Sequence, residues 1–183
     1  LVSKGCIEGY YYKPRIDKEI LREHSEGLIA HSACLAGEVP KLLLNGEKDK
    51  AREVVREHID IFGRDNYFIE IQDHNLPEQK QILPQLIDLA RSEGVDIVAT
   101  NDIHYLTKED AFYQDVLMCI QMEETVKNED RMTFKTEEFY IKSEAEMREI
   151  FNYIPEACDN TQKIADRCRV DFDFNTRHLP KFD

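Results

Sequence analysis

The chain has 183 residues, of which 42% are hydrophobic, and its 24 Lys and Arg against 37 Asp and Glu give a formal net charge of −13. This length suits one substantial core and is short for two domains. The acidic balance argues against strong binding of a phosphate backbone by the chain itself, and the sequence has no apolar run of about 18 to 20 residues that could span a membrane.

The cysteines indicate an environment in which thiols stay reduced. They number five and include no C-x-x-C pair, so neither a disulfide framework nor a zinc ribbon is indicated. The first residues lack the charged-then-apolar order of a signal peptide. We therefore expect a cytoplasmic protein without membrane association. The chain begins with Leu rather than Met, which suggests an excerpt of a longer protein.

An aromatic and basic segment, YYYKPRID, spans residues 10–17. Lys13 and Arg15 could contact a phosphate while the tyrosine rings contact a base. The alternative is an extended Lys-Pro segment whose tyrosines pack on the domain, with Asp17 capping the next helix.

Three short apolar runs, residues 27–34, 67–72 and 95–100, each predict a strand. Segments with apolar residues at helical spacing lie between them, and these helices are expected to end at Gly63 and near Gly94. Because proline in a helix interior costs about 3 kcal/mol, Pro84 is expected in the first turn of the second helix. Alternating strands and helices predict an α/β fold with a parallel sheet or barrel.

Signals for helix starts follow the third strand. Each is a capping pair or a proline at the first helical position, and they occur at Thr107 with Asp110, Ser143 with Glu146, and Pro155. Residues 121–135 are predicted to form a charged loop, and residues 139–141 one more short strand.

Asp102 and His104 follow the third apolar run directly. If residues 95–100 form a strand, side chains two positions apart point to the same side, so a carboxylate and an imidazole would project together from its carboxyl end. That arrangement suits a metal ligand pair or acid/base chemistry. The alternative is a polar turn in which Asp102 is a cap and His104 is hydrogen-bonded at the surface.

The first two strands also end near residues that can bind metal. Cys34 precedes Gly37, where a helix N-terminus could favour the thiolate form; the alternative is that it is a small buried apolar side chain. Glu70 and His74 lie on the second strand and in the loop after it. All three strands would then bring such side chains to one rim, although Glu70 could instead pair with a Lys or Arg inside a barrel.

Several segments together resemble a known family: GYYYKPRIDKEIL, GLIAHSACLAGEVPKLLLNG, YFIEIQDH, VATNDIHYL, FYIKSEAEM, NTQKIADRC and LPKF. Their order and spacing are similar to the PHP (polymerase and histidinol phosphatase) domain of bacterial DNA polymerase III alpha subunits. The resemblance implies part of a distorted (β/α)7 barrel with parallel strands alternating with helices. It assigns residues 1–178 to the C-terminal two-thirds of a PHP domain whose N-terminal strands and helices are missing, and residues 179–183 to the start of a connector to the polymerase palm.

The resemblance also implies roles for particular residues. Cys34, Asp102 and His104 correspond to metal ligands, and Asp102 and His104 also to catalytic residues, with zinc or manganese at this site and magnesium at the absent palm. The resemblance gives no ligand role to Glu70 or His74. From the residues alone, Glu70, His74, Lys13 and Arg15 remain candidates for contacting the ligands rather than the metal.

The function implied by the resemblance is that of a part of the replicative polymerase, which carries out DNA-directed DNA synthesis. Its PHP region would be a metal-dependent phosphoesterase-like module, inactive in this fragment. The partners would be the rest of the alpha subunit, a proofreading exonuclease, a sliding clamp and, through the parent protein, DNA. The alternatives are a structural scaffold that docks polymerase and exonuclease, and a stand-alone PHP phosphatase.

Overall fold

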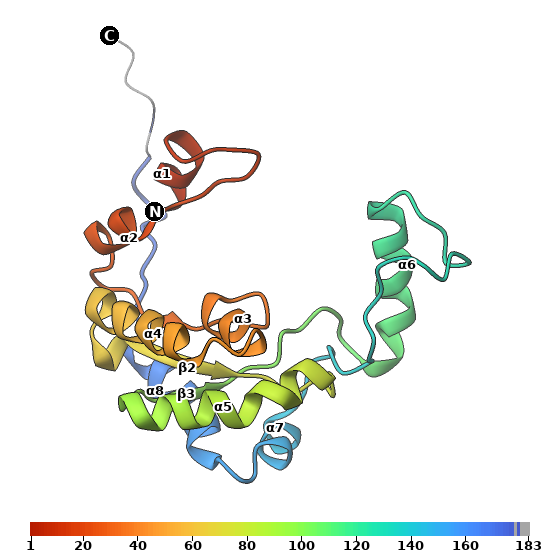
Figure 1. Ribbon diagram of the computed structural model, residues 1–183. Coiled ribbons are helices and arrows are strands. Elements are labelled where there is room, and N and C mark those ends of the chain that lie inside the picture. The colour runs from red at the N-terminus through yellow and green to blue at the C-terminus, as the bar shows by residue number, and fades with distance from the viewer. Residues whose placement is uncertain (178, 180–183) are drawn as a thin grey trace.

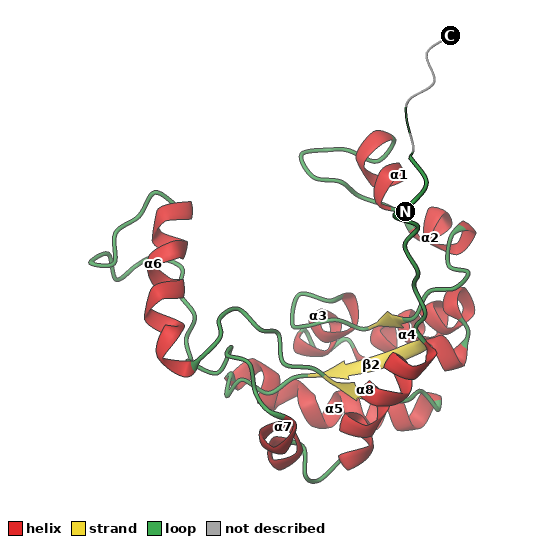
Figure 2. Cartoon of the chain, turned by 180° about the vertical axis from the view of Figure 1, so that it is seen from behind, coloured by secondary structure: helices red, strands yellow, loops and turns green. Residues whose placement is uncertain are grey.

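The computed structural model describes residues 1–177 and 179, and its centre is a three-stranded parallel sheet in the order β1-β2-β3. The strands are β1 (Ala30–His31), β2 (Tyr67–Ile71) and β3 (Ile97–Ala99). The register pairs Ala30 with Tyr67 and Ile69 with Ile97. Figure 2 shows helices on both sides of the sheet. The predicted α/β class, with a parallel sheet whose strands alternate with helices, is confirmed.

Helices precede, separate and follow the strands. They are α1 (Val2–Ile7), α2 (Lys18–Glu23), α3 (Glu38–Leu44), α4 (Lys48–Phe62), the 3-10 turn η1 (Arg64–Asn66), α5 (Pro77–Glu93), the 3-10 turn η2 (Lys108–Asp110), α6 (Ala111–Gln121), α7 (Glu144–Ile150) and α8 (Pro155–Arg167). Helices α4 and α5 pack on β2, and α8 packs on β3 (Figure 1).

The core lies between the sheet and these helices. Ile69 and Ile71 of β2 are fully buried, as is Val55 of α4, and Phe151 closes the core beside α8. Both faces of β2 are covered, which explains why its sequence is almost continuously apolar rather than alternating. Burying an aliphatic side chain of this size contributes roughly 1.5 to 3 kcal/mol.

The helix boundaries largely follow the predicted signals. Helix α4 ends before Gly63, and α5 before Gly94 in the left-handed conformation with φ +64°, where glycine avoids the cost of a Cβ atom. Pro84 departs from the prediction because it lies inside α5, while Pro77 takes the first helical position. An interior proline is tolerated here because tertiary packing on both sides of it outweighs one missing helical hydrogen bond.

Two of the predicted strands differ from the structure: one is shorter than predicted and the other does not form. The run 27–34 is extended only at Ala30–His31, because positive φ angles at Gly27 (+75°) and Ala33 (+64°) turn the chain on either side. Residues 139–141 form an isolated parallel bridge, between Tyr140 and Tyr105, rather than a strand. There the chain turns away at Ser143, whose hydroxyl accepts the Glu146 amide to start α7, as the predicted capping box requires.

Helix α6 extends away from the sheet as an arm, which we define as residues 111–135 (Figure 1). Phe112, Leu117 and Ile120 expose most of their side chains. The chain returns from the tip of the arm beside α6, where Arg131 makes a two-pronged ion pair with Asp115.

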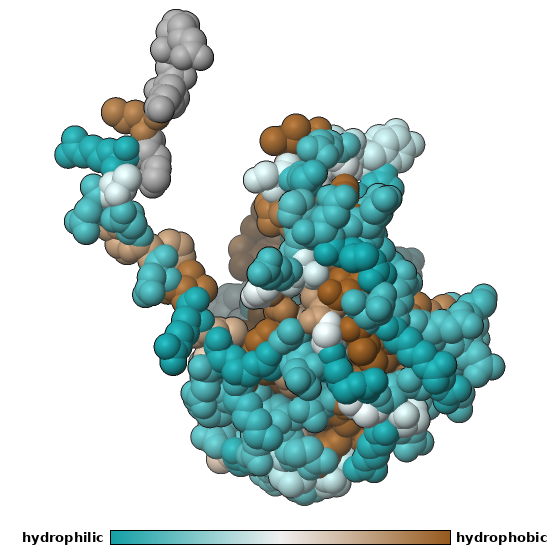
Figure 3. Space-filling view, turned by 90° about the vertical axis from the view of Figure 1, so that its left-hand side faces the viewer, coloured by the Kyte–Doolittle hydropathy of each residue, from teal (hydrophilic) through white to brown (hydrophobic). Residues whose placement is uncertain are grey.

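On the face shown in Figure 3, hydrophilic residues cover most of the surface and apolar patches lie among them. Among the described residues, no helix combines the length and the apolar character needed to cross a membrane. Of the predicted connector at residues 179–183, residue 179 alone is described, and the remainder lies outside the described residues.

Candidate metal site at the carboxyl ends of the strands

A cavity of about 440 Å³ opens where the three strands end. Cys34 follows β1, Gln72 follows β2 and Asp102 follows β3, and all three line the cavity. Parallel strands have their carboxyl ends at one edge of a sheet, so residues distant in sequence become neighbours there. The opposite wall comes from the end of the arm: Met132, Thr133, Phe134 and Lys135.

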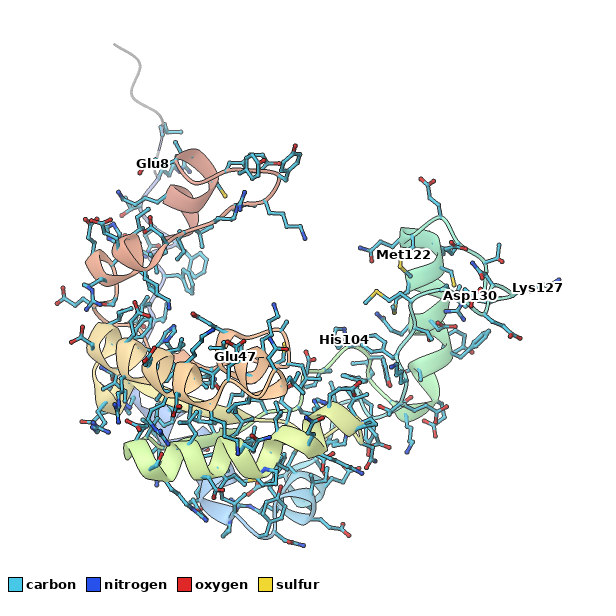
Figure 4. The ribbon with its side chains drawn as sticks, viewed as in Figure 1. Glu8, Glu47, His104, Met122, Lys127 and Asp130 are labelled. Atoms are coloured by element: carbon cyan, nitrogen blue, oxygen red, sulfur yellow. The ribbon has the colours of Figure 1, made fainter. Side chains whose placement is uncertain are left out.

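Asp102 and His104 form a close acid–imidazole pair, with 3.3 Å between the Asp102 Oδ1 and His104 Nε2 atoms. The His104 ring packs against Phe134 and Phe139, and its backbone N–H donates to the Phe139 carbonyl over 2.8 Å. Figure 4 shows His104 on the segment that leads from β3 toward α6. Because β3 ends at Ala99, the two side chains meet through a turn and not by alternation along a strand.

The turn places Asp102 in an unusual backbone conformation, with φ +40°. For a residue other than glycine this costs on the order of 1 kcal/mol or more, and such residues gather at functional sites. The surrounding contacts must therefore maintain the turn, and the Asp102 carboxylate is presented at the cavity by strained rather than relaxed backbone.

Cys34 sits on a tight turn between β1 and α3. The Gly37 N–H donates to the Cys34 carbonyl over 2.8 Å, and a Cβ atom on Gly37 would come within 2.3 Å of the Ser32 carbonyl oxygen. Only glycine allows this close approach. The turn keeps the partly exposed Cys34 at the cavity rim.

The donor types at this rim suit a divalent metal, since zinc accepts thiolate, imidazole and carboxylate ligands. Within residues 1–177 and 179, however, no three His, Cys, Asp or Glu side chains lie close enough together to bind one ion. Asp102 and His104 are a close pair, and Cys34 lines the same cavity without joining them. The described residues thus bring two donor side chains together and place a third at the same cavity.

Comparison with known proteins decides the family. The family model for the PHP domain matches residues 1–74. The DNA polymerase III alpha subunit of Treponema pallidum is 51% identical over 93% of this chain, and that of Thermus aquaticus is 45% identical over the whole chain. The chain belongs to the DNA polymerase III alpha subunit family. It spans 14% and 15% of the length of these two relatives, and it corresponds to their PHP region.

Glu70 connects all three strands and has no Lys or Arg partner among the described residues. Its carboxylate accepts hydrogen bonds from the Thr100 hydroxyl and the Gln72 amide, and the His31 Nδ1 atom lies 3.6 Å away. Burial raises the pKa of the Glu70 carboxyl, but His31, Thr100 and Gln72 outweigh burial and lower it. Glu70 is therefore ionised, and its carboxylate connects the ends of the three strands.

His74 is fully buried and uses both ring nitrogens within the protein. Its Nε2 atom lies 2.7 Å from the Asn101 carbonyl oxygen, and the Gln79 side-chain amide lies 2.9 Å from its Nδ1 atom. The ring also stacks on Phe139 with centroids 4.3 Å apart. With no ring nitrogen left for a metal, His74 contacts the segment that carries the ligand candidates instead.

Lys13 and Arg15 do not line the cavity. They lie on the exposed loop between α1 and α2, where the Arg15 guanidinium stacks 4.5 Å from the centre of the Tyr11 ring and donates to the Tyr11 carbonyl. The tyrosines of this loop, Tyr10 to Tyr12, are exposed rather than packed on the domain.

Several residues that shape the site carry no recognisable sequence signal. Gln79 lies in the first turn of α5, and the Asn101 amide donates to the Tyr140 carbonyl over 2.6 Å. Lys142 is nearly buried against Glu138 and Asn101, and burial lowers its pKa. These contacts join segments distant in sequence, and single-sequence patterns do not reveal them.

Proposed function

We propose that this chain is the PHP region of a replicative DNA polymerase III alpha subunit and serves DNA-directed DNA synthesis in the cytoplasm. The observation that carries the proposal is 45% identity to the Thermus aquaticus alpha subunit along the entire chain. In the parent protein it would work beside the polymerase palm, with its magnesium ions, and near a proofreading exonuclease and a sliding clamp. With a net charge of −13 the region itself would add little to DNA affinity.

At the strand ends we assign Cys34, Asp102 and His104 as part of a metal-binding set for phosphoester hydrolysis, with zinc favoured by the thiol and manganese as the second choice. When bound, such an ion supplies an activated water and neutralises phosphate charge. Asp102 and His104 would bind the ion and orient that water, and Phe134 would shield the His104 ring from solvent. Because the described residues give an incomplete set, the isolated chain would be inactive.

The second candidate function is a scaffold that steadies the polymerase and docks the exonuclease. It is favoured by one observation: the loops at the strand ends are connected by many hydrogen bonds, among them those of His74 and Asn101. In this case any metal in the cavity would serve structure rather than hydrolysis.

The test is metal analysis of the complete alpha subunit purified without added metal. For wild type we expect zinc or manganese in stoichiometric amount, lost in Asp102→Asn and in Cys34→Ser, while both variants remain folded and keep polymerase activity. Asp88→Asn, at an exposed acid on α5, is the matched control. A wild-type protein free of both metals, or variants that lose folding without losing metal, would favour the scaffold.

A further inference from the structure

The contacts of His74 and Gln79 fix the tautomer of the imidazole. The His74 backbone N–H can only donate, and it donates to Gln79 Oε1 over 2.7 Å, so the Gln79 amide nitrogen must face the ring. That nitrogen can only donate, and it lies 2.9 Å from His74 Nδ1, which is therefore the acceptor. The Asn101 carbonyl can only accept, so Nε2 carries the ring proton.

The hydrogen bond from His74 Nε2 acts directly on the strained turn. Its acceptor, the Asn101 carbonyl, belongs to the peptide group that joins Asn101 to Asp102, the residue with φ +40°. Fixing this peptide plane limits the rotation that would relax Asp102. On the other side of Asp102, the His104 N–H is bound to the Phe139 carbonyl, and Phe139 is the ring on which His74 stacks.

Further contacts make His74 a junction of three segments. Its own carbonyl accepts the Thr136 hydroxyl over 2.8 Å, which ties it to the chain returning from the arm. Gln79 is also buried and comes from α5. A buried histidine whose ring nitrogens and backbone carbonyl are all hydrogen-bonded is held in one orientation. Its hydrogen bond to Asn101 then restrains the Asp102–His104 turn.

We infer that His74, oriented by Gln79, is a positioning residue that sets the geometry of Asp102 and His104. This inference rests on the proposed function for its purpose, since the positioned groups are the proposed metal ligands.

The test compares three substitutions in the full chain. His74→Phe retains the flat ring and its stacking on Phe139 but removes both ring hydrogen bonds. His74→Gln retains a side-chain N–H for the Asn101 carbonyl. His58→Phe is the control, because the half-buried His58 ring is also stacked on aromatic rings, those of Phe62 and Tyr67, but belongs to α4.

The first readout is NMR of the metal-free chain. In His74→Phe we expect hydrogen exchange at the His104 amide to rise by about tenfold relative to the core amides of β2, and the Asp102 carbon shifts to move away from those of a positive φ. His74→Gln should reverse most of both changes, and His58→Phe should produce neither. An unchanged Asp102–His104 turn in a folded His74→Phe chain would overturn the inference.

If His74→Phe does not fold, Gln79→Met decides the same question, because it removes the partner of Nδ1 and leaves the imidazole in place. Faster exchange at His104 supports the inference, and unchanged exchange opposes it.

The second readout separates this inference from the proposed function. In the complete alpha subunit titrated with zinc chloride, His74→Phe should weaken binding by roughly tenfold and His74→Gln should restore it. Absence of zinc and manganese binding in wild type would contradict the proposed function, while the NMR measurements would still decide whether His74 positions the turn.

Discussion

Replacing Thr100 by valine tests how the three strand ends are connected. The Thr100 hydroxyl donates to the Glu70 carboxylate and accepts from the Gln72 amide over 3.0 Å. Valine has nearly the same shape, so the change removes the hydrogen bonds without creating a cavity. A hydrogen bond to a charged group contributes about 1.5 to 3 kcal/mol, and Gln72 still donates to Glu70, so we expect a loss of about 2 kcal/mol in the free energy of unfolding at pH 7.

The loss should depend on pH in a defined direction. Burial opposes ionisation of Glu70, but His31 and Thr100 favour it, and the net pKa lies below the ordinary value. The stabilisation from such a carboxyl is present above its unfolded-state pKa and is lost as the pH falls through the folded-state pKa. The cost of Thr100→Val should therefore shrink as Glu70 becomes protonated.

Urea unfolding followed by circular dichroism measures both effects, with Thr125→Val, at an exposed loop position, as the matched control. In a Glu70→Gln background, the cost of Thr100→Val should fall by about 1 kcal/mol, because the acceptor is then neutral. An equal cost in both backgrounds, or a cost no larger than that of Thr125→Val, would refute the assignment of Glu70 as an ionised link.

Three further predictions concern the core, the Cys34 turn and the start of α7. Ile69→Ala, at a fully buried position of β2, should reduce the free energy of unfolding in urea by about 2 to 5 kcal/mol and Ile69→Val by about 1 kcal/mol; similar costs for both would contradict close packing there. Gly37→Ala should destabilise the chain by roughly 2 kcal/mol or more, because the new Cβ would meet the Ser32 carbonyl oxygen at 2.3 Å, and an unchanged thermal midpoint would show that the turn can adapt. In an NMR titration, Glu146 should show a pKa of about 2, lowered by hydrogen bonds from the Ser143 side chain and backbone; this stabilisation is lost as the pH falls toward 2, and Ser143→Ala should raise the pKa.

Local features of the fold were predictable from the sequence because their causes are local. The Ser143–Glu146 capping pair lies within one turn of helix, and Gly63 and Gly94 end the helices that precede them. The prediction that Pro84 lies in the first turn of its helix was wrong, because the packing of α5 outweighs the local cost of a proline.

The candidate site was predictable only in part. That Cys34 and Asp102 line one cavity follows from parallel strands ending at one edge. His74 was a predicted contact of the ligand candidates, but its partners Gln79 and Asn101 were not predicted, since they come from a helix and from another strand end. The composition of residues 139–141 predicted a strand. They form only a bridge, whose partner Tyr105 lies far away in sequence.

The arm has a consequence for the cooperativity of the molecule. Cys119 is the one buried residue of α6, all of which the structure describes, and the helix contacts chiefly the 3-10 turn before it and the chain that returns beside it. A helix with so little covered surface can open without disturbing the sheet. Heating should therefore melt the arm in a separate, earlier step, so that helical signal declines before the tyrosine environment of β2 changes, and a single two-state transition would not describe the whole chain.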